Sequence, residues 1–254
     1  MRIRACLGGK GAATWEELIQ SVRAKVKGTK AKLRLGASSG EWKAMVADET
    51  ARTVFAKNIK KVLQQHKLDG IDLDFEWAEN AKEYEDYSQA ILKMREVLGD
   101  RYIFSVSLHP VCYKISQEAI AAVDFISLQC YGPSPVRFPI EKYCSDIQMV
   151  LDYGIPKEKL VAGVPFYGVT KDNSKKTEAY FSFVQDGLVT GPAQNEVTYK
   201  ADVYVFDGQD NIRTKTRYTK EQGLRGMMSW DLATDLPLSD SRSLLKAMIE
   251  ELKR

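Results

Sequence analysis

Short apolar runs alternate with longer stretches of helical periodicity along most of this chain, and this order constrains the fold more than any other feature. Apolar residues in the longer stretches recur at the spacing of one helix face, which indicates amphipathic helices. The predicted strands are Lys32–Leu35, Gly70–Phe75, Tyr102–Leu108, Asp124–Tyr131, Leu160–Val164 and Gly226–Trp230. Strands that alternate with helices predict a parallel sheet built from β-α-β units.

The stretches between these strands predict the helices that cover the sheet. Ser116 is a good N-cap and predicts a short helix after it. The longer predicted helices are Trp15–Lys27, Glu49–Gln65, Ala81–Leu98, Pro139–Tyr153 and Leu244–Leu252, together with one that ends at Tyr218–Gln222. Met1–Leu7 is a further candidate strand. We therefore predict one TIM-type (β/α)8 barrel domain over residues 1–254.

The pattern changes between Thr170 and Arg217, where turn residues separate short β-rich runs such as Val203–Phe206. Such a pattern is typical of antiparallel hairpins. We predict that residues 170–217 form a small α+β insertion before the last barrel strand.

Composition excludes several classes of function. The 37 basic and 34 acidic residues leave a net charge of +3, which is too small and dispersed to predict a nucleic-acid partner. No run of 18 apolar residues predicts a membrane span. The two histidines and four widely spaced cysteines match no familiar zinc pattern, and no GxSxG elbow frames a serine. We predict neither a metal nor a cofactor.

The segment Leu68–Trp77 alternates between apolar and acidic residues. Side chains on a strand point alternately to opposite faces, so Asp72, Asp74 and Glu76 share one face. The apolar residues share the other face, which we expect to meet the outer helices. The acidic face then points into the barrel, and Glu76 lies at the C-terminal mouth, where barrel active sites are built.

Three carboxylates on one inward face are expensive to bury, so their presence favours function over structure. Close carboxylates cannot all ionise, and we expect a shared proton, with Glu76 as the protonated donor. A donor beside an orienting carboxylate is the machinery of glycoside cleavage. Two alternatives are a divalent metal site, for which no second acidic or His cluster completes a shell, and an acidic strand end in solvent.

The sequence DGIDLDFEW resembles the DGxDxDxE motif of glycoside hydrolase family 18, which contains chitinases, endo-β-N-acetylglucosaminidases and chitinase-like lectins. Four later segments resemble barrel strands of that family in the right order. They are Phe104–Pro110, Asp124–Tyr131, Lys159–Gly168 and Gly223–Asp231. The resemblance covers roughly residues 30 to 254.

The resemblance implies a substrate-assisted retaining glycosidase that cleaves β-1,4 linkages next to N-acetylglucosamine, in chitin-like oligo- or polysaccharides or an N-glycan core. Glu76 is implied to protonate the glycosidic oxygen while the acetamido oxygen of the substrate attacks C1. Asp74 is implied to hold the acetamido N–H, and Asp72 to share a proton with Asp74. A non-catalytic lectin and a peptidoglycan-directed glucosaminidase are the alternatives.

Tyr131 is implied to hydrogen-bond the acetamido group, and Trp230 to form an aromatic floor beneath the sugar, with core packing as the alternative for Trp230. Gln129, Tyr167 and Asp69 complete the expected substrate-binding set, although packing inside the barrel is the favoured alternative for Tyr167. The family resemblance implies a secreted or periplasmic protein, but the opening MRIRACLGGKG lacks the apolar core of a signal peptide.

Three departures from the family pattern bear on the site and the fold. Arg34 stands where the third strand usually carries a small serine, and it adds a positive charge near Asp72. Gly132 follows Tyr131 where Asp or Asn is usual, so one polar contact to the sugar is missing. Only about 31 residues precede Lys32. We therefore expect the first strand to be missing and the unpaired edges to favour self-association.

Overall fold

The computed structural model describes residues 14–38, 40–132, 138–172 and 176–254. The chain divides into two compact units, the first ending at Ile126 and the second beginning at Ser127. The candidate strand Met1–Leu7 lies outside the described residues.

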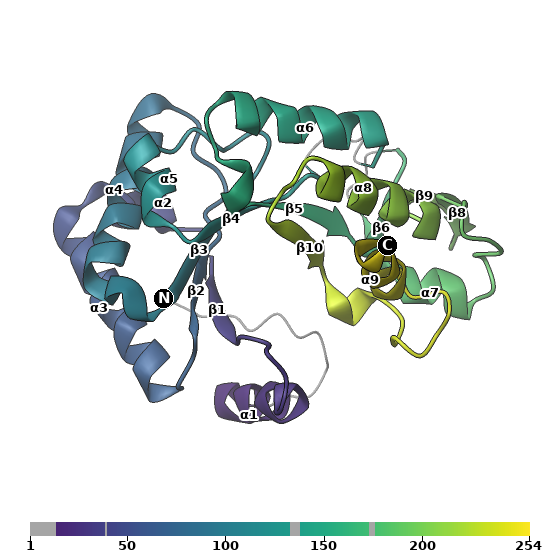
Figure 1. Ribbon diagram of the computed structural model, residues 1–254, viewed down its shortest axis with the longest axis horizontal. Coiled ribbons are helices and arrows are strands. Elements are labelled where there is room, and N and C mark those ends of the chain that lie inside the picture. Colours follow the sequence, from purple (N-terminus) through teal and green to yellow (C-terminus); the bar gives the residue numbers. More distant parts are fainter. Residues whose placement is uncertain (1–13, 39, 133–137, 173–175) are drawn as a thin grey trace. The chain divides into compact units, whose positions relative to one another are not determined.

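The first unit contains parallel strands in the order β1-β2-β3-β4, and β4 continues across the boundary into the second unit (Figure 1). These strands are β1 (Arg34–Ala37), β2 (Gly70–Leu73), β3 (Ile103–Leu108) and β4 (Phe125–Leu128). The register aligns Asp72 of β2 with Gly36 on one side and Ser105 on the other. Neighbouring strands therefore bring their side chains to the level of the predicted acidic face.

Most helices of the first unit begin at a residue whose side chain caps the helix. Ser116 accepts the N–H of Ala119, as the sequence predicts, and Asn80 accepts the N–H of Glu83. The helices are α1 (Trp15–Val26), α2 (Trp42–Ala47), α3 (Glu49–Gln65), α4 (Ala81–Leu98) and α5 (Gln117–Ala122), with a 3-10 turn at Gly99–Arg101.

An aromatic cluster packs on the apolar face of β2, which is the face that the sequence assigns to the outer helices. Phe75, which follows β2, is 2% exposed and stacks on Trp42 of α2 with ring centres 5.4 Å apart. Tyr87 of α4 lies 5.3 Å from Phe75, and its hydroxyl donates to the carbonyl of Leu73 at 3.4 Å. The indole N–H of Trp42 donates to the carbonyl of Glu76 at 3.1 Å, so this cluster also holds the backbone at the predicted donor.

The second unit contains β5 (Leu160–Pro165) and β10 (Gly226–Trp230), which pair in parallel. Its longer helices are α6 (Ile140–Asp152), α8 (Gln209–Glu221) and α9 (Leu244–Lys253), with 3-10 turns at Lys157–Lys159 and Leu232–Thr234. Lys215 of α8 is almost fully buried and forms an ion pair with buried Asp207, with a separation of 2.6 Å between Nζ and Oδ2. The pair links the middle of α8 to the segment just before the helix.

An antiparallel sheet in the order β7-β6-β9-β8 forms the predicted insertion. Its elements are β6 (Tyr167–Thr170), β7 (Thr177–Ala179), α7 (Tyr180–Gln185), β8 (Glu196–Tyr199) and β9 (Asp202–Val205). Helix α8, however, begins at Gln209, inside the predicted range of 170–217. Its buried face includes Gln209, Lys215, Thr216 and Thr219, so apolar periodicity does not reveal it. The insertion boundaries and the assignment of residues 1–254 to one domain stay predictions.

Replacement of Trp42 tests whether the aromatic cluster holds the end of β2. Trp42→Ala removes the stacked ring and should lower the free energy of unfolding by about 3–5 kcal/mol. Trp42→Phe keeps a ring but loses the bond to the Glu76 carbonyl, and should cost about 1 kcal/mol. Urea unfolding measures both. The exposed Val54→Ala on α3 is the control, and a Trp42→Ala variant as stable as this control would contradict the role of the cluster.

Candidate functional site

Asp72 is held by polar side chains from both neighbouring strands. Ser107 donates its hydroxyl to Asp72 Oδ2 at 2.7 Å, and Ser105 donates to Oδ1. The Arg34 guanidinium donates to the Ser105 hydroxyl and lies 3.7 Å from Asp72 Oδ1. The positive charge that the sequence places near Asp72 therefore forms a direct ion pair with it.

Burial raises the pKa of Asp72 above its ordinary value, because desolvation disfavours the charged carboxylate. Desolvation is the largest of the influences on this pKa. The hydrogen bonds from Ser105 and Ser107 and the charge of Arg34 oppose this rise. Burial also lowers the pKa of the Arg34 guanidinium, against the pull of Asp72. Arg34 and Asp72 thus form a desolvated ion pair, in which each charge stabilises the charged form of the other.

Exposure increases along the acidic face from Asp72 toward the end of the strand. Asp72 and Asp74 are half-buried and Glu76 is exposed, while the apolar residues between them are buried. The Asp74 N–H donates to the Ala37 carbonyl at 2.9 Å, so pairing with β1 continues to the level of Asp74. This increase in exposure is expected for an acidic face that leads to the C-terminal end of a barrel strand, where active sites are built.

Beyond Glu76, residues on two loops pack against each other. Trp77 lies 5.2 Å from His109, ring centre to ring centre, and Cys112 Sγ accepts the N–H of Ala78 at 3.2 Å. Burial raises the pKa of the Cys112 thiol, and the nearby Glu76 charge adds to the rise. Cys112 is therefore a packing residue that holds the loop after Glu76.

Asp69 precedes β2, so it lies at the opposite end of the strand from Glu76. It accepts the N–H of Leu33 at 2.7 Å, and Lys32 approaches it at 3.5 Å. These contacts tie the start of β2 to the segment before β1. A substrate-binding role for Asp69 stays a prediction.

The predicted residues Gln129, Tyr131, Tyr167 and Trp230 belong to the second unit. Tyr131 is 5% exposed, and its hydroxyl lies 3.9 Å from Met228 Sδ. Tyr167 is half-buried and meets the Tyr131 ring edge-on, with centres 6.3 Å apart. Trp230, at the end of β10, is 43% exposed, so its indole is not a core residue. An exposed aromatic face is what a sugar platform requires.

Sequence reasoning did not single out Ser105 and Ser107, although the signal was present. In the strand Tyr102–Leu108 these serines alternate with apolar residues and therefore share one face. Only the register of β3 against β2 shows that this face meets Asp72.

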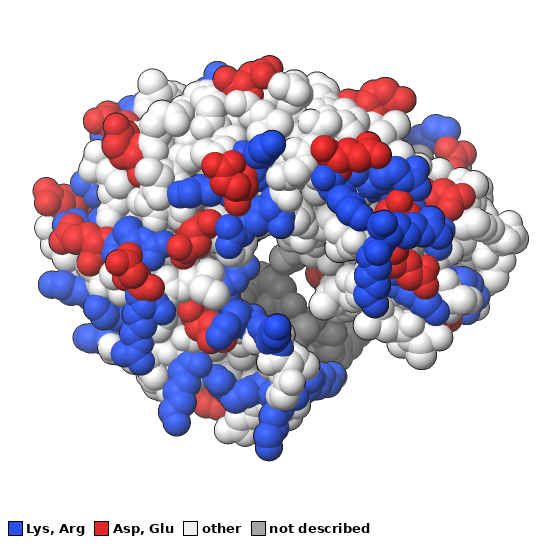
Figure 2. Space-filling view, viewed as in Figure 1, with Lys and Arg blue, Asp and Glu red and all other residues white. Residues whose placement is uncertain are grey.

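Charges of both signs are interspersed on the face of the molecule seen in Figure 2, with basic side chains over α1 and the loop after it. The exposed basic residues in that segment are Arg23, Lys25, Lys27, Lys30 and Lys32. Within the described ranges, no helix is long and apolar enough to cross a bilayer. The same residues contain no cluster of three or more His, Cys, Asp or Glu side chains suited to a metal ion.

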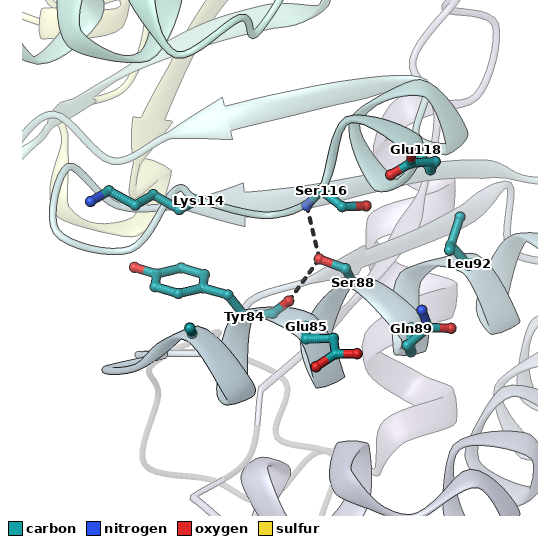
Figure 3. A pocket seen from close by; sticks show the side chains of 9 residues that line it. Tyr84, Glu85, Ser88, Gln89, Leu92, Lys114, Ser116 and Glu118 are labelled. Atoms are coloured by element: carbon teal, nitrogen blue, oxygen red, sulfur yellow. Dashed lines mark hydrogen bonds between the residues drawn. The ribbon is translucent and has the colours of Figure 1, made fainter.

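A hollow of about 460 Å³ on the first unit lies along α4 and the residues before α5 (Figure 3). Ser88 donates to the Tyr84 carbonyl at 2.7 Å and accepts the N–H of Ser116 at 2.9 Å. Leu92 and Glu118 also line it. None of the predicted site residues lines this hollow. The hollow is therefore not supported as the site of glycoside cleavage.

A sequence model described as "Glycosyl hydrolases family 18" matches residues 10–235. The chain belongs to this family. The matched range includes the acidic segment, and the barrel fold predicted from the sequence is confirmed.

Named relatives and solved structures agree with membership of family 18. "Probable chitinase 2" of Drosophila melanogaster is 22% identical over 78% of this chain, which spans 54% of that relative's length. A chitinase from Bacteroides thetaiotaomicron superimposes with a TM-score of 0.84 at 19% identity, covering 94% of this chain and 81% of that one. A class V chitinase mutant from Nicotiana tobaccum in complex with NAG4 gives a TM-score of 0.77 at 17% identity, covering 94% and 85%.

Gly163 tests how tightly Tyr131 is packed. A Cβ atom there would lie 2.7 Å from the Leu128 carbonyl oxygen and 3.0 Å from Tyr131 Cε1. Because the carbonyl cannot move cheaply, Gly163→Ala should destabilise the protein by about 1–3 kcal/mol and disturb the tyrosine signal in near-UV circular dichroism. Gly226→Ala on β10 has open space and should change stability by less than about 0.5 kcal/mol. Equal stability of the two variants would show that the packing around Gly163 and Tyr131 has room for an added methyl group.

Proposed function

We propose that this protein hydrolyses β-1,4 linkages next to N-acetylglucosamine in chitin-like glycans by a substrate-assisted retaining mechanism. The observation that carries the proposal is the graded acidic face of β2, with Asp72 fixed by β1 and β3 and Glu76 exposed. Membership of family 18 and the NAG4 complex of the Nicotiana tobaccum chitinase support this substrate class.

In the first step Glu76 donates its proton to the glycosidic oxygen as the bond to C1 breaks. The acetamido carbonyl oxygen of the same sugar attacks C1 and forms an oxazolinium ion. In the second step a water molecule attacks C1 and gives a proton to Glu76, which restores both the sugar and the donor. The same carboxyl group therefore acts first as acid and then as base.

The two aspartates support these steps without forming a covalent bond. Asp74 accepts the acetamido N–H, which orients the attacking oxygen and stabilises the positive charge that develops on the ring. Asp72 shares a proton with Asp74, because two neighbouring carboxylates on one face ionise together only at a high cost. Asp72 is well suited to this supporting role, since Ser105 and Ser107 hold both of its oxygens.

The residues of the second unit are proposed to bind the sugar. Trp230 offers its exposed indole face to the C–H face of a pyranose, and the Tyr131 hydroxyl donates to the acetamido group. Gln129 supplies a further polar contact, and Tyr167 supports the Tyr131 ring from the side. Asp69 makes its contacts with Leu33 and Lys32 at the other end of β2, so the proposed mechanism gives it no direct step.

Glu76→Gln tests the donor. The amide cannot donate a proton to the leaving group in the same way, so we expect release of a fluorogenic group from an N,N′-diacetylchitobioside to fall by about 10²- to 10⁴-fold. Glu85→Gln is the matched control, because Glu85 is an exposed glutamate on α4 and should leave the rate unchanged.

Two outcomes would contradict this function. An unchanged rate in Glu76→Gln would remove Glu76 from the reaction. Calorimetric binding of chitotetraose by the wild-type protein without turnover of any chito-oligosaccharide or peptidoglycan fragment would instead identify a lectin.

Self-association is a second proposal, and it concerns the edges of the parallel strands. Within the described residues β1 pairs with β2 alone, and β10 pairs with β5 alone. We propose that a second copy of the chain adds to such an edge, since unpaired strand edges invite another strand. Sedimentation velocity over a wide concentration range should show a concentration-dependent dimer, and a monomer throughout would contradict the proposal.

A further inference from the structure

Arg34 is a feature of the site that the proposed mechanism does not use. It stands on β1, and its guanidinium both lies 3.7 Å from Asp72 and donates to Ser105, which in turn donates to Asp72. A strand that faces a barrel interior ordinarily carries a small or apolar residue, and a desolvated arginine is retained only where it is paired. Arg34 therefore contacts Asp72 both through the ion pair and through the hydrogen bonds of the Ser105 hydroxyl.

The other groups around this pair do not replace the charge of Arg34. Ser105 and Ser107 on β3 are neutral donors, and Tyr87 on α4 is a buried phenol whose pKa is raised well above its ordinary value by burial, with the Asp72 charge adding to the rise. Asp74 lies next along the same face of β2, and its negative charge disfavours a second charge on Asp72. Arg34 is therefore the cation that faces Asp72 among the described residues of these elements.

The elements beyond Arg34 hold it in place without neutralising it. Its guanidinium lies 4.6 Å from the centre of the Phe125 ring on β4. Asp124, whose charge also acts on Arg34, pairs with Arg95 of α4 at 3.0 Å and accepts the N–H of Phe104. The guanidinium thus keeps its charge available for Asp72.

We propose that Arg34 is a positioning residue that sets the acidic limit of turnover by stabilising the negative charge of Asp72. This inference rests on the function proposed above. Burial disfavours the charge on Asp72, and Arg34, Ser105 and Ser107 all stabilise it. A charged Asp72 can accept the proton that the two aspartates are proposed to share.

The pH profile of turnover tests this role. Arg34→Met removes the charge, so the pKa of Asp72 should rise further and the acidic limb of kcat should move to higher pH. On that limb kcat should fall roughly tenfold while KM changes by less than about twofold, because Arg34 acts through Asp72 and not on the sugar. Arg34→Lys keeps a positive charge and should restore most of the acidic limb.

Arg101→Met is the matched control for the loss of an arginine. Arg101 is exposed and lies over the Tyr102 ring, 5.4 Å from its centre, so its removal should leave the profile unchanged. A profile of Arg34→Met that keeps the wild-type limb and loses activity evenly at every pH would overturn the proposal and reduce Arg34 to a packing role.

Unfolding free energies test the same charge without any turnover. A buried carboxyl with a raised folded pKa contributes stability at low pH, and this contribution is lost as pH rises through the folded pKa. Since Arg34→Met raises the pKa of Asp72 further, the variant should lose most stability at neutral pH and progressively less as the pH falls. In the Asp72→Asn background the effect of Arg34→Met should no longer depend on pH.

The two measurements separate the two proposals. If Arg34→Met lowers the unfolding free energy by the same amount at every pH, in both the wild-type and the Asp72→Asn backgrounds, the proposed role of Arg34 is wrong. This holds whether or not the protein is active. The predicted pH dependence of unfolding in a protein that turns over no chitobioside would support the ionised Asp72 and count against the proposed function alone.

Discussion

The alternation of side chains along β2 is the constraint on which the rest of the site depends. One face carries apolar residues that end in Phe75, and the other carries the three carboxylates. The apolar face is covered by Trp42 and Tyr87, which also bond the carbonyls of Glu76 and Leu73. The same packing that stabilises the strand therefore fixes the direction of the acidic face, because a rotation would expose the aromatic cluster.

Desolvation makes the opposite face costly, and the neighbouring strands offset that cost. Asp72 is half-buried, and both of its oxygens accept hydroxyl hydrogen bonds from β3. Arg34 adds the opposite charge from β1. Glu76, by contrast, is exposed and free of this burial. The segment formed by β2 and the residues after it thus places a restrained carboxylate and an exposed one on one face, which is the asymmetry that acid catalysis with an orienting partner needs.

Elements with an apolar face were predictable, and those with a polar buried face were not. Glu49–Gln65, Ala81–Leu98 and Gly226–Trp230 have the bounds that the sequence predicts, and both helices bury apolar residues along one face. Helix α8 was recognised only at its end, since its buried face consists largely of polar side chains, among them Lys215 and two threonines. The spacing of apolar residues records only hydrophobic burial, so it does not reveal a charged side chain that is buried in an ion pair.

The sequence by itself determined the acidic motif, its placement on one face of a strand and the family to which the chain belongs, because alternation and spacing are local properties. Tertiary structure alone decided which side chains stand beside each carboxylate. The register of β1 and β3 brings Arg34, Ser105 and Ser107 to Asp72, and the end of β10 leaves Trp230 exposed. Those contacts join residues far apart in the chain, and only the packing of strands sets their distances.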